Sequence, residues 1–383
     1  MKVEKLLDVV QIKNPKPEKF SGEKRYYSTG NINEYDVSEN FGLVKFENRP
    51  SRANVQPIEN SVGFAKMKST AKTVLVTKNH SECIFSTGMN FLVPSEKIIS
   101  KYLYYYLISP YFLDLKDKYS GQGIMGGLSN KDLNLFKIPV PSLQEQEKIV
   151  ERLDKVFENI DKASVAKENE MLSLTNLFDS FLDNKIEEFG ESEQKLGEYY
   201  DVRDGTHDSP KYYEKGYPLI TSKNLKDGQL NFEKIKFISE EDFNKINERS
   251  KVNKGDVLMA MIGTIGNPVV IKDNSKFAIK NVALFKLNKN QSSEYLYYFL
   301  RSNKVKKKMM AEAKGTTQKF VGLGYLRNFT ITGKFDLNAE NEVVFLISKI
   351  ENIVNALINN QQQIYTKLLE LKKSVLKKEF SYE

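Results

Sequence analysis

Two long stretches of the chain repeat apolar residues at alternating steps of four and three positions, the spacing of one face of a helix. The first runs from Ser142 to Phe189 and the second from Phe335 to Phe380, and neither contains proline or glycine. Ser142 followed by Glu145 forms a capping box, which predicts where the first helix begins. Such spacing keeps an apolar seam facing a partner helix, so we predict a coiled coil. The seam positions are Ile149, Leu153, Val156 and Ile160 in the first stretch, and Val343, Ile347, Ile350, Val354 and Leu357 in the second.

Helices of about 45 residues are roughly 68 Å long at 1.5 Å per residue, too long for an ordinary domain to bury. We therefore expect the two helices to pack on each other as an antiparallel pair with pseudo-twofold symmetry. The next seam positions, Lys167 and Gln361, are polar and lie near the middle of each helix. Beyond them the predicted seam continues through Met171, Leu174, Phe178 and Phe181, and through Ile364, Leu368, Leu371 and Val375. Either Lys167 and Gln361 form a polar layer that fixes the register, or the seam stutters and both side chains point to water.

The regions between the helices repeat each other. Residues 102–109 match residues 295–302 at six of eight positions, at an offset of 193. We expect both matching segments to be short helices whose aromatic side chains pack in a domain core. The sequence therefore predicts an α+β fold built as a pseudo-twofold tandem repeat. Mixed α/β domains occupy residues 1–141 and 191–334, and the long helices occupy residues 142–190 and 335–383.

Composition narrows the class of protein. The 383 residues carry 58 Lys and Arg against 50 Asp and Glu, a formal charge of +8 that permits a polyanionic partner. No run of 18 apolar residues occurs, and the N-terminus lacks the apolar core of a signal peptide. A single cysteine, Cys83, excludes an intramolecular disulfide and fits a reducing cytoplasm.

The local motifs of common enzymes do not occur in the sequence. It contains no phosphate-binding G-x-x-x-x-G-K-[ST] loop, no G-x-G-x-x-G turn, no G-x-S-x-G elbow and no H-E-x-x-H. Two histidines and one cysteine are too few for a structural zinc site. We therefore expect no catalytic residues and no metal site in this chain.

Four loops of the second domain are rich in small and polar side chains. They are residues 202–210, 219–224, 262–266 and 315–319. The glycines of Ile262-Gly263-Thr264-Ile265-Gly266 would let the backbone approach a phosphate closely. Each loop alone is a weak signal, because loops are generally rich in such residues.

Taken together, these loops resemble a target recognition domain of type I restriction-modification specificity subunits. The resemblance rests on Asp204-Gly205-Thr206-His207 with Pro210, on residues 255–258 and on residues 262–266. Residues 138–146 resemble the segment with which that family enters its first long helix. The order of domain, helix, domain and helix covers the whole chain. The first domain departs from the pattern, with Ile12 to Lys16 in place of residues 204–207 and Thr77 to Ser81 near the place of residues 262–266.

The resemblance implies a non-catalytic subunit that reads a bipartite double-stranded DNA target. Such proteins hold two methyltransferase subunits, which bind S-adenosylmethionine and methylate adenine, and nuclease subunits that use ATP and Mg²⁺ can join them. No cofactor is then expected in this chain. The residue pattern also leaves open a non-catalytic coiled-coil scaffold whose domains bind protein and not DNA. A self-contained nuclease or methyltransferase is disfavoured by the missing motifs.

Residue type and loop position indicate the candidate DNA contacts. Lys211, Lys223, Lys319 and Arg52 would neutralise phosphates. Base edges could be reached by Arg203, His207, Asn224, Thr264 and Gln318. Their neighbours in the second-domain loops are Asp204, Gly205, Thr206, Thr221, Ser222, Gly263, Gly266 and Thr317. The further candidates of the first domain are Arg25, Tyr26, Arg49, Asn54, Lys66, Lys68 and Gln122.

Overall fold

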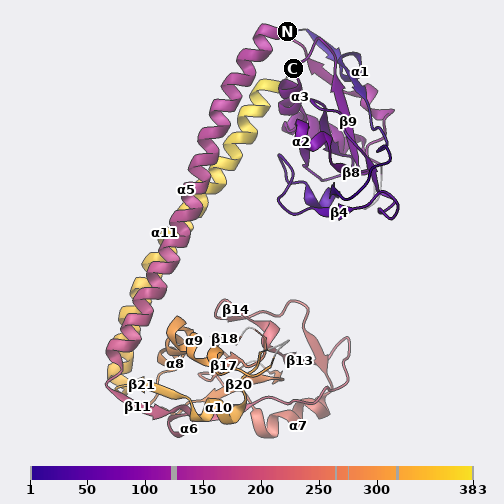
Figure 1. Ribbon diagram of the computed structural model, residues 1–383. Helices are drawn as coiled ribbons and strands as arrows, with labels where there is room; N and C mark the ends of the chain where they lie inside the picture. Colours follow the sequence, from indigo (N-terminus) through magenta and orange to yellow (C-terminus); the bar gives the residue numbers. More distant parts are fainter. Residues whose placement is uncertain (1, 122–126, 264, 275, 316–318, 382–383) are drawn as a thin grey trace. The chain divides into compact units, whose positions relative to one another are not determined.

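A computed structural model describes residues 2–121, 127–263, 265–274, 276–315 and 319–381 (Figure 1). The chain divides into two compact units. Unit 1 comprises Met1–Glu168 and Gln362–Glu383, and unit 2 comprises Asn169–Gln361. Each unit thus contains one domain together with part of each long helix, whereas the boundaries expected from the sequence lie at the helix ends.

Unit 1 contains, within its described residues, a two-stranded sheet and two four-stranded sheets. Its strands are β1 (Val3–Lys5), β2 (Val10–Ile12), β3 (Lys24–Tyr27), β4 (Gly42–Val44), β5 (Ala53–Val55), β6 (Val62–Ala65), β7 (Thr73–Leu75), β8 (Ile84–Ser86), β9 (Met89–Pro94) and β10 (Lys137–Pro139). Its helices are α1 (Leu6–Val9), η1 (Thr29–Asn31), α2 (Lys78–Ser81), α3 (Ser100–Leu107), α4 (Pro110–Tyr119), η2 (Asp132–Leu135), the first part of α5 (Leu143–Phe189) and the last part of α11 (Leu337–Phe380).

Unit 2 contains, within its described residues, a four-stranded sheet, a three-stranded sheet and two two-stranded sheets. Its strands are β11 (Ser192–Lys195), β12 (Asp201–Asp204), β13 (Tyr217–Ile220), β14 (Leu225–Lys226), β15 (Gln229–Leu230), β16 (Lys236–Ile238), β17 (Val257–Ala260), β18 (Gly266–Val270), β19 (Ala278–Ile279), β20 (Val282–Lys286) and β21 (Thr330–Gly333). Its helices are α6 (Leu196–Tyr199), η3 (Ser222–Asn224), α7 (Glu240–Ser250), α8 (Ser293–Arg301), α9 (Asn303–Ala311) and α10 (Leu323–Asn328), with the remaining parts of α5 and α11.

The strand order confirms the tandem repeat. The antiparallel sheet β2-β9-β6-β7 of unit 1 has the same order of connections as β12-β20-β17-β18 of unit 2. The parallel pair of β3 with β8 matches that of β13 with β19. The matching aromatic segments form α3 and α8, and Tyr102, Tyr106 and Tyr295 are fully buried. These aromatic residues pack in the cores, as the sequence predicted.

The long helices are held to the domains at equivalent positions. The Gln146 side chain near the start of α5 accepts a hydrogen bond from the Ile99 N–H at 2.9 Å. Glu340 near the start of α11 accepts one from the Ser292 N–H at 2.8 Å and another from the Tyr199 hydroxyl at 3.0 Å. Both side chains are fully buried, and burial raises the pKa of the Glu340 carboxyl. Each helix start is therefore fixed by a polar group that no water reaches.

Within each unit, the segments of α5 and α11 run antiparallel. In unit 1, Arg152 pairs with Glu379 and Asp161 pairs with Lys372. In unit 2, Phe178 and Leu182 of α5 share an apolar cluster with Val354 of α11. The predicted seam residues Ile149, Leu153 and Ile160 are buried, as are Ile347 and Val354. Val156, Val343 and Ile350 are half-buried.

The seam departs from the predicted heptads along α11. Leu357 is 43% exposed, and Ile358 is half-buried in its place. Further along, Leu371 is 47% exposed, whereas the adjacent Lys372 lies inward with its ammonium 5.0 Å from the ring centres of Tyr35 and Phe157. A straight helix has 3.6 residues per turn, so a 3.5-residue repeat drifts off the contact face after a few turns.

The polar layer expected at Lys167 and Gln361 stays a prediction, because Lys167 belongs to unit 1 and Gln361 to unit 2. Lys167 and Gln361 are each half-buried, so neither side chain points fully to water. The amide oxygen of Gln361 is buried and has no hydrogen-bond partner among the described residues.

The end of α11 packs in the core of unit 1. Phe380 is fully buried, with its ring centre 5.3 Å from that of Tyr102 and 5.9 Å from that of Tyr106. Phe380→Ala should destabilise unit 1 by about 3–5 kcal/mol, because it leaves a cavity among packed rings. Hydrogen exchange during urea unfolding should show lost protection in α3 and unchanged protection in α8.

The matched control is Phe345→Ala, which truncates a side chain of the same helix that is 70% exposed. This variant should change stability by less than about 0.5 kcal/mol. Equal effects of the two substitutions, or unchanged protection of α3 in the Phe380 variant, would contradict the packing described above.

Candidate nucleic-acid interface

The register of the four-stranded sheet of unit 2 brings three loops to one edge. Asp204 at the end of β12 lies opposite Ala283, and Ala260 at the end of β17 lies opposite both Val282 and Gly266. Because these strands are antiparallel neighbours, the segments 205–209, 261–265 and 279–281 all leave the sheet on the same side. We call this side, with the adjoining residues 221–224, 314–315 and 319–321, the second-domain edge.

A buried carboxylate organises the first loop of this edge. Asp204 is 5% exposed and accepts hydrogen bonds at 2.8 Å from both the Arg249 guanidinium and Nε2 of His207. The other ring nitrogen of His207 lies 2.8 Å from Oδ1 of Asn281. His207 is exposed, but both of its ring nitrogens are engaged within the domain. A base contact by His207 would have to replace one of these bonds.

The sequence did not predict that Arg249 and Asn281 belong to this edge. Arg249 lies 45 positions from Asp204, and Asn281 lies 74 positions from His207. No local spacing connects residues so far apart, and only the sheet brings them together. A positive φ of 54° at Asn281 marks the tight turn that delivers its side chain.

Backbone pairing joins two loops that the sequence singled out separately. Ile262 forms an isolated bridge with Phe320, and the Gly263 N–H donates to the Lys319 carbonyl at 3.0 Å. The Val321 N–H donates to the Met261 carbonyl at 3.0 Å. Residues 261–263 and 319–321 therefore form one joint surface, on which Lys319 is exposed. The predicted contacts Thr264, Thr317 and Gln318 lie outside the described residues.

Residues 221–224 divide into structural and exposed positions. Asn224 is buried: its side-chain oxygen accepts hydrogen bonds from the N–H and the hydroxyl of Thr221, both at 2.9 Å, and its side-chain NH₂ donates to the Asn231 carbonyl at 2.9 Å. Its amide is therefore used in the fold and not offered to a base. Ser222 donates to the Asn281 carbonyl at 3.2 Å, and Lys223 is exposed. Lys211 is also exposed, 5.6 Å from the ring centre of Tyr213.

The guanidinium of Arg203 is likewise engaged within the domain. Its Nη2 lies 2.6 Å from Asp201, and its Nη1 donates to the Arg249 carbonyl at 2.9 Å. The hydrogen bond from Arg203 lowers the pKa of the Asp201 carboxyl. The predicted base contact by Arg203 would require this pairing to break.

Unit 1 forms a matching edge with different side chains, which we call the first-domain edge. Asn14, just after β2, donates to the Asn90 side chain at 3.0 Å, and Asn90 donates to that of Asn130 at 2.8 Å. The Lys66 N–H, just after β6, donates to the Gly88 carbonyl at 3.0 Å, and the Lys66 carbonyl accepts from the Leu128 N–H at 2.9 Å. Segments 13–16, 66–72 and 127–130 therefore meet at this edge.

This arrangement corrects the equivalence expected from the sequence. The turn between β6 and β7, residues 66–72, occupies the place of the turn between β17 and β18, residues 261–265. Residues Thr77 to Ser81, which were expected there, instead form the helix α2 and its N-cap. Strand pairing within each hairpin determines which loops of the two domains are equivalent. This pairing cannot be inferred from loop composition alone.

The predicted contacts of the first domain separate into two groups. Lys66 and Lys68 lie in the turn 66–72, and burial lowers the pKa of the Lys66 ammonium. Arg52 and Asn54 flank the start of β5, which pairs with the end of β8 at the same edge. Of the other four, Arg25 and Tyr26 lie near the level of the start of β8, Arg49 contacts Phe46 and Asn54, and Gln122 is outside the described residues.

Within the described ranges, His, Cys, Asp and Glu side chains form no group of three or more that could hold a metal ion. None of the described helices is both long and apolar enough to cross a membrane.

Comparison with known proteins identifies related sequences. The sequence model of the type I restriction modification DNA specificity domain matches residues 1–171 and 191–333. The chain is 25% identical over 379 residues to the type I restriction enzyme MjaVIII specificity subunit of Methanocaldococcus jannaschii, covering 92% of this chain and 86% of that protein. It is 21% identical over 280 residues to the EcoKI specificity subunit of Escherichia coli, covering 66% of this chain and 59% of that protein.

Two solved structures share the fold. One, from a study of complex assembly and conformational transition of the type I R-M system, superposes with a TM-score of 0.74 at 19% identity, covering 98% of this chain and 96% of the other. The HsdS subunit of Thermoanaerobacter tengcongensis superposes with a TM-score of 0.51 at 19% identity, covering 99% and 96%. These likenesses extend over both domains and both long helices.

The second-domain edge depends on the close approach of Gly205 to a neighbouring strand. A β-carbon at Gly205 would lie 2.2 Å from the Ile279 carbonyl oxygen. Gly205→Ala should therefore push residues 279–281 away and cost about 1–3 kcal/mol of stability. Urea unfolding should show the loss, and hydrogen exchange should show reduced protection at residues 279–281.

Gly324→Ala is the control, because a β-carbon there has no neighbour within 4 Å. In helix α10 this substitution should stabilise by about 0.5–1 kcal/mol. The proposed organisation of the edge fails if Gly205→Ala leaves both stability and exchange unchanged.

Proposed function

We propose that this chain reads a bipartite double-stranded DNA target, because it belongs to the family of type I restriction-modification DNA specificity proteins. Each domain would read one half of the target, and the chain itself would catalyse no reaction. It would direct the chemistry of partner subunits in the cytoplasm.

The observation that carries this proposal is one sheet topology repeated with two different edges. The two four-stranded sheets have the same strand order, so equivalent loops leave equivalent sides. The second-domain edge carries His207, Lys223 and Lys319, whereas the first-domain edge carries the half-buried Lys66 and the exposed Lys68. Base sequence is read by side chains in the grooves. Different side chains on the same scaffold would therefore read different half-sites.

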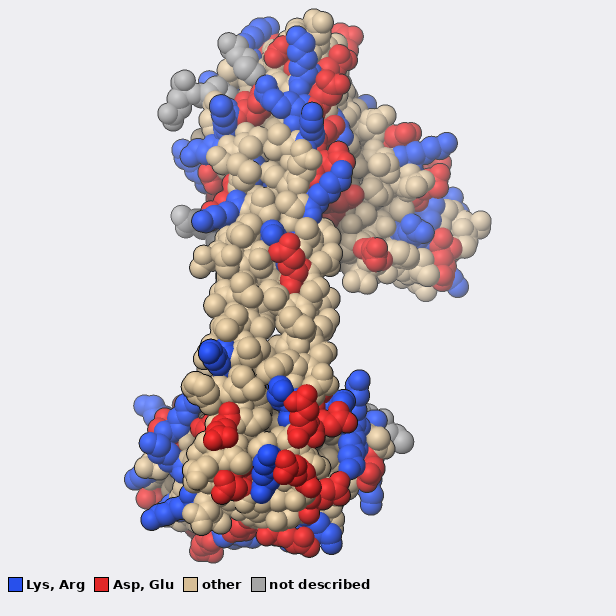
Figure 2. Space-filling view, turned by 90° about the vertical axis from the view of Figure 1, so that its left-hand side faces the viewer, with Lys and Arg blue, Asp and Glu red and all other residues tan. Residues whose placement is uncertain are grey.

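The long helices supply a second argument, which concerns protein partners. In unit 2, the outward-facing side chains of Leu172, Leu177 and Phe345 are 60%, 63% and 70% exposed. Residues 352–366 of α11 contain no charged residue. The face drawn in Figure 2 shows few charged side chains over the middle of these helices, in contrast to the mixed charges over the domains. Exposed apolar surface of this kind is typical of a protein interface.

We infer that this surface receives adenine methyltransferase subunits. Two such subunits are expected, because the chain contains two equivalent helix starts, one at Gln146 and one at Glu340. S-adenosylmethionine would then bind to the methyltransferase and not to this chain. Nuclease subunits that use ATP and Mg²⁺ would be further partners. The scaffold alternative shares the protein contacts but requires no DNA contact.

Co-expression tests the proposal directly. Cells that express this chain together with the methyltransferase of its own system should acquire methylated adenines within one bipartite motif with an unread spacer. Cells that express either protein alone should acquire none. Sequencing of modified bases would reveal the motif.

A single uninterrupted motif, or no motif despite a stable complex, would contradict the proposal. A scaffold is distinguished by the binding of purified complex to duplex DNA. Affinity that falls steeply with salt indicates phosphate contacts, and a scaffold should show no such slope.

A further inference from the structure

Helix α9 carries a concentration of positive charge that the loop candidates do not include. Its nine residues, Asn303–Ala311, contain Lys304, Lys306, Lys307 and Lys308 and no acidic residue. This run of lysines is visible in the sequence. Its functional significance depends on where the helix lies and on whether acidic residues already neutralise its charges.

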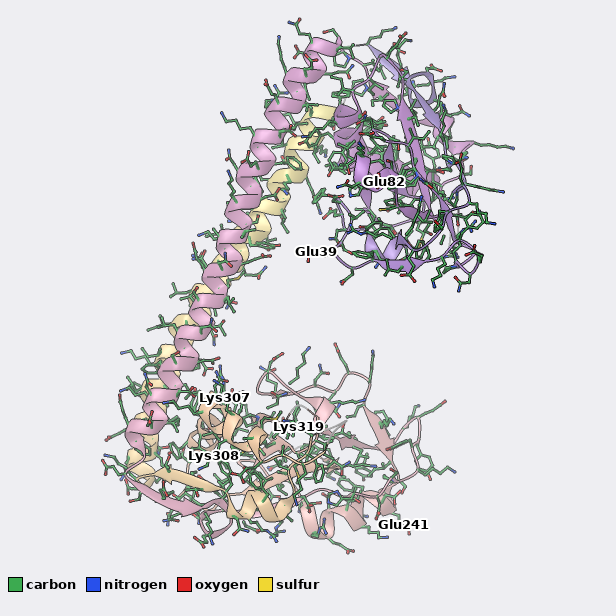
Figure 3. The ribbon with its side chains drawn as sticks, viewed as in Figure 1. Glu39, Glu82, Glu241, Lys307, Lys308 and Lys319 are labelled. Atoms are coloured by element: carbon green, nitrogen blue, oxygen red, sulfur yellow. The ribbon has the colours of Figure 1, made fainter. Side chains whose placement is uncertain are left out.

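The helix adjoins the second-domain edge. The side chain of Lys306 passes within 3.5 Å of the position a β-carbon would take on Gly266, at the end of the turn 261–265. The ammonium of Lys319 lies 3.4 Å from the Met310 carbonyl of α9. Figure 3 shows Lys307, Lys308 and Lys319 in the same region of the domain, with Glu241 of α7 far from them. The lysines of α9 therefore extend the surface formed by the loops.

Among the described residues, the hydrogen bonds and ion pairs between acidic side chains and α9 lie at its N-cap and first turn. Asp179 and Asp183 also act on the Lys306 ammonium through their charges. Asp183 of α5 accepts hydrogen bonds from the Ser302 hydroxyl at 2.6 Å and from the Lys304 N–H at 3.2 Å. Asp179 accepts one from Asn303 at 3.0 Å, and Glu187 pairs with Lys304. These contacts anchor the positive end of the helix dipole.

The remaining lysines are not paired in this way. Among the described residues no ion pair involves Lys306, Lys307 or Lys308. Lys307 and Lys308 are exposed, and the ammonium of Lys308 lies 5.5 Å from the ring centre of Phe329. Lys306 is half-buried, and burial lowers the pKa of its ammonium. The acidic residue nearest along the chain is Glu312, just after the helix.

The first domain provides an internal comparison. Ser109 caps α4 as Ser302 caps α9, which aligns the two helices at the offset of the repeat. Helix α4 contains two lysines and two aspartates, so its formal charge is zero, against four positive charges for α9. Asp114 stands where α9 has Lys307, and the buried Lys116 stands where α9 has the buried Met309. The shared fold therefore does not require the lysines of α9.

We propose that α9 binds the phosphate backbone of duplex DNA beside the half-site read by the second-domain edge. This inference rests on the proposed function and adds a division of labour. Exposed lysines on a helix neutralise phosphates whatever the base sequence, whereas loops supply sequence discrimination. The second domain then contributes more of the sequence-independent affinity than the first.

The test is the salt dependence of DNA binding by the full-length chain with its methyltransferase partner. The probe is a duplex of mixed sequence, and the variant is Lys307→Ala with Lys308→Ala. The slope of log affinity against log salt should become less steep by about 1.8, from about 0.9 for each lost phosphate contact. The methylated motif mapped in cells should stay the same.

The matched control is Lys254→Ala with Lys272→Ala. These two exposed lysines lie in the segments that precede β17 and follow β18, at the opposite end of the same sheet. The control removes the same charge from the same domain and should keep the wild-type slope. A further variant, Lys307→Asp, introduces the residue that α4 carries at this position and should weaken binding without unfolding the domain.

The outcomes separate the two proposals. A wild-type slope in the α9 variant, an equal loss in the control, or an altered methylation motif in the α9 variant would each overturn the role of α9 alone. No salt-dependent DNA binding by the wild-type complex would refute the proposed function and this inference with it.

Discussion

The register of one antiparallel sheet is the constraint on which each domain depends. In unit 2 it sets Asp204 and Met259 on either side of Ala283, with Val282, Ala260 and Gly266 in the next row, and the loops that follow must leave the sheet together. A shift of one residue would turn every side chain of the strand to the opposite face and would separate Asp204 from Arg249 and His207. The apolar residues of the strands hold the register, since Val257 and Leu284 are fully buried. The second-domain edge is thus a consequence of core packing.

The same scaffold allows the two edges to differ in chemistry without differing in fold. Buried polar groups keep each edge in place: an amide chain through Asn90 in the first domain and the Asp204 carboxylate in the second. Exposed positions around these groups are free to vary, because their side chains make few contacts that stability requires. Helix α9 and helix α4 illustrate this freedom, since one carries four lysines where the other balances lysines with aspartates. Charge can therefore be distributed unequally between two domains of the same topology.

The sequence was sufficient for the architecture because the repeat and the helix periodicity are local signals. Six identities between residues 102–109 and 295–302 located both aromatic helices, and the absence of proline and glycine located both long ones. Contacts between distant residues could not be predicted in the same way. The side chain of Asn224 is of a type that can read bases, yet its amide hydrogen-bonds to Thr221 and Asn231 within the domain. The heptad pattern failed at Leu371 because drift of the seam brings Lys372 inward. Sequence identified loops of suitable chemistry, and only the sheet register decided which side chains remain available.

Hydrogen exchange of the full-length chain with its methyltransferase partner, measured with and without a duplex that carries the methylated motif, tests the central claim most directly. The claim is that the two edges contact DNA. DNA should increase protection at residues 66–72 of the first domain and at residues 204–209 of the second. Residues 252–256 and 271–274, at the opposite end of the second sheet, should not change. Protection confined to one domain, or confined to the opposite ends of the sheets, would contradict the account.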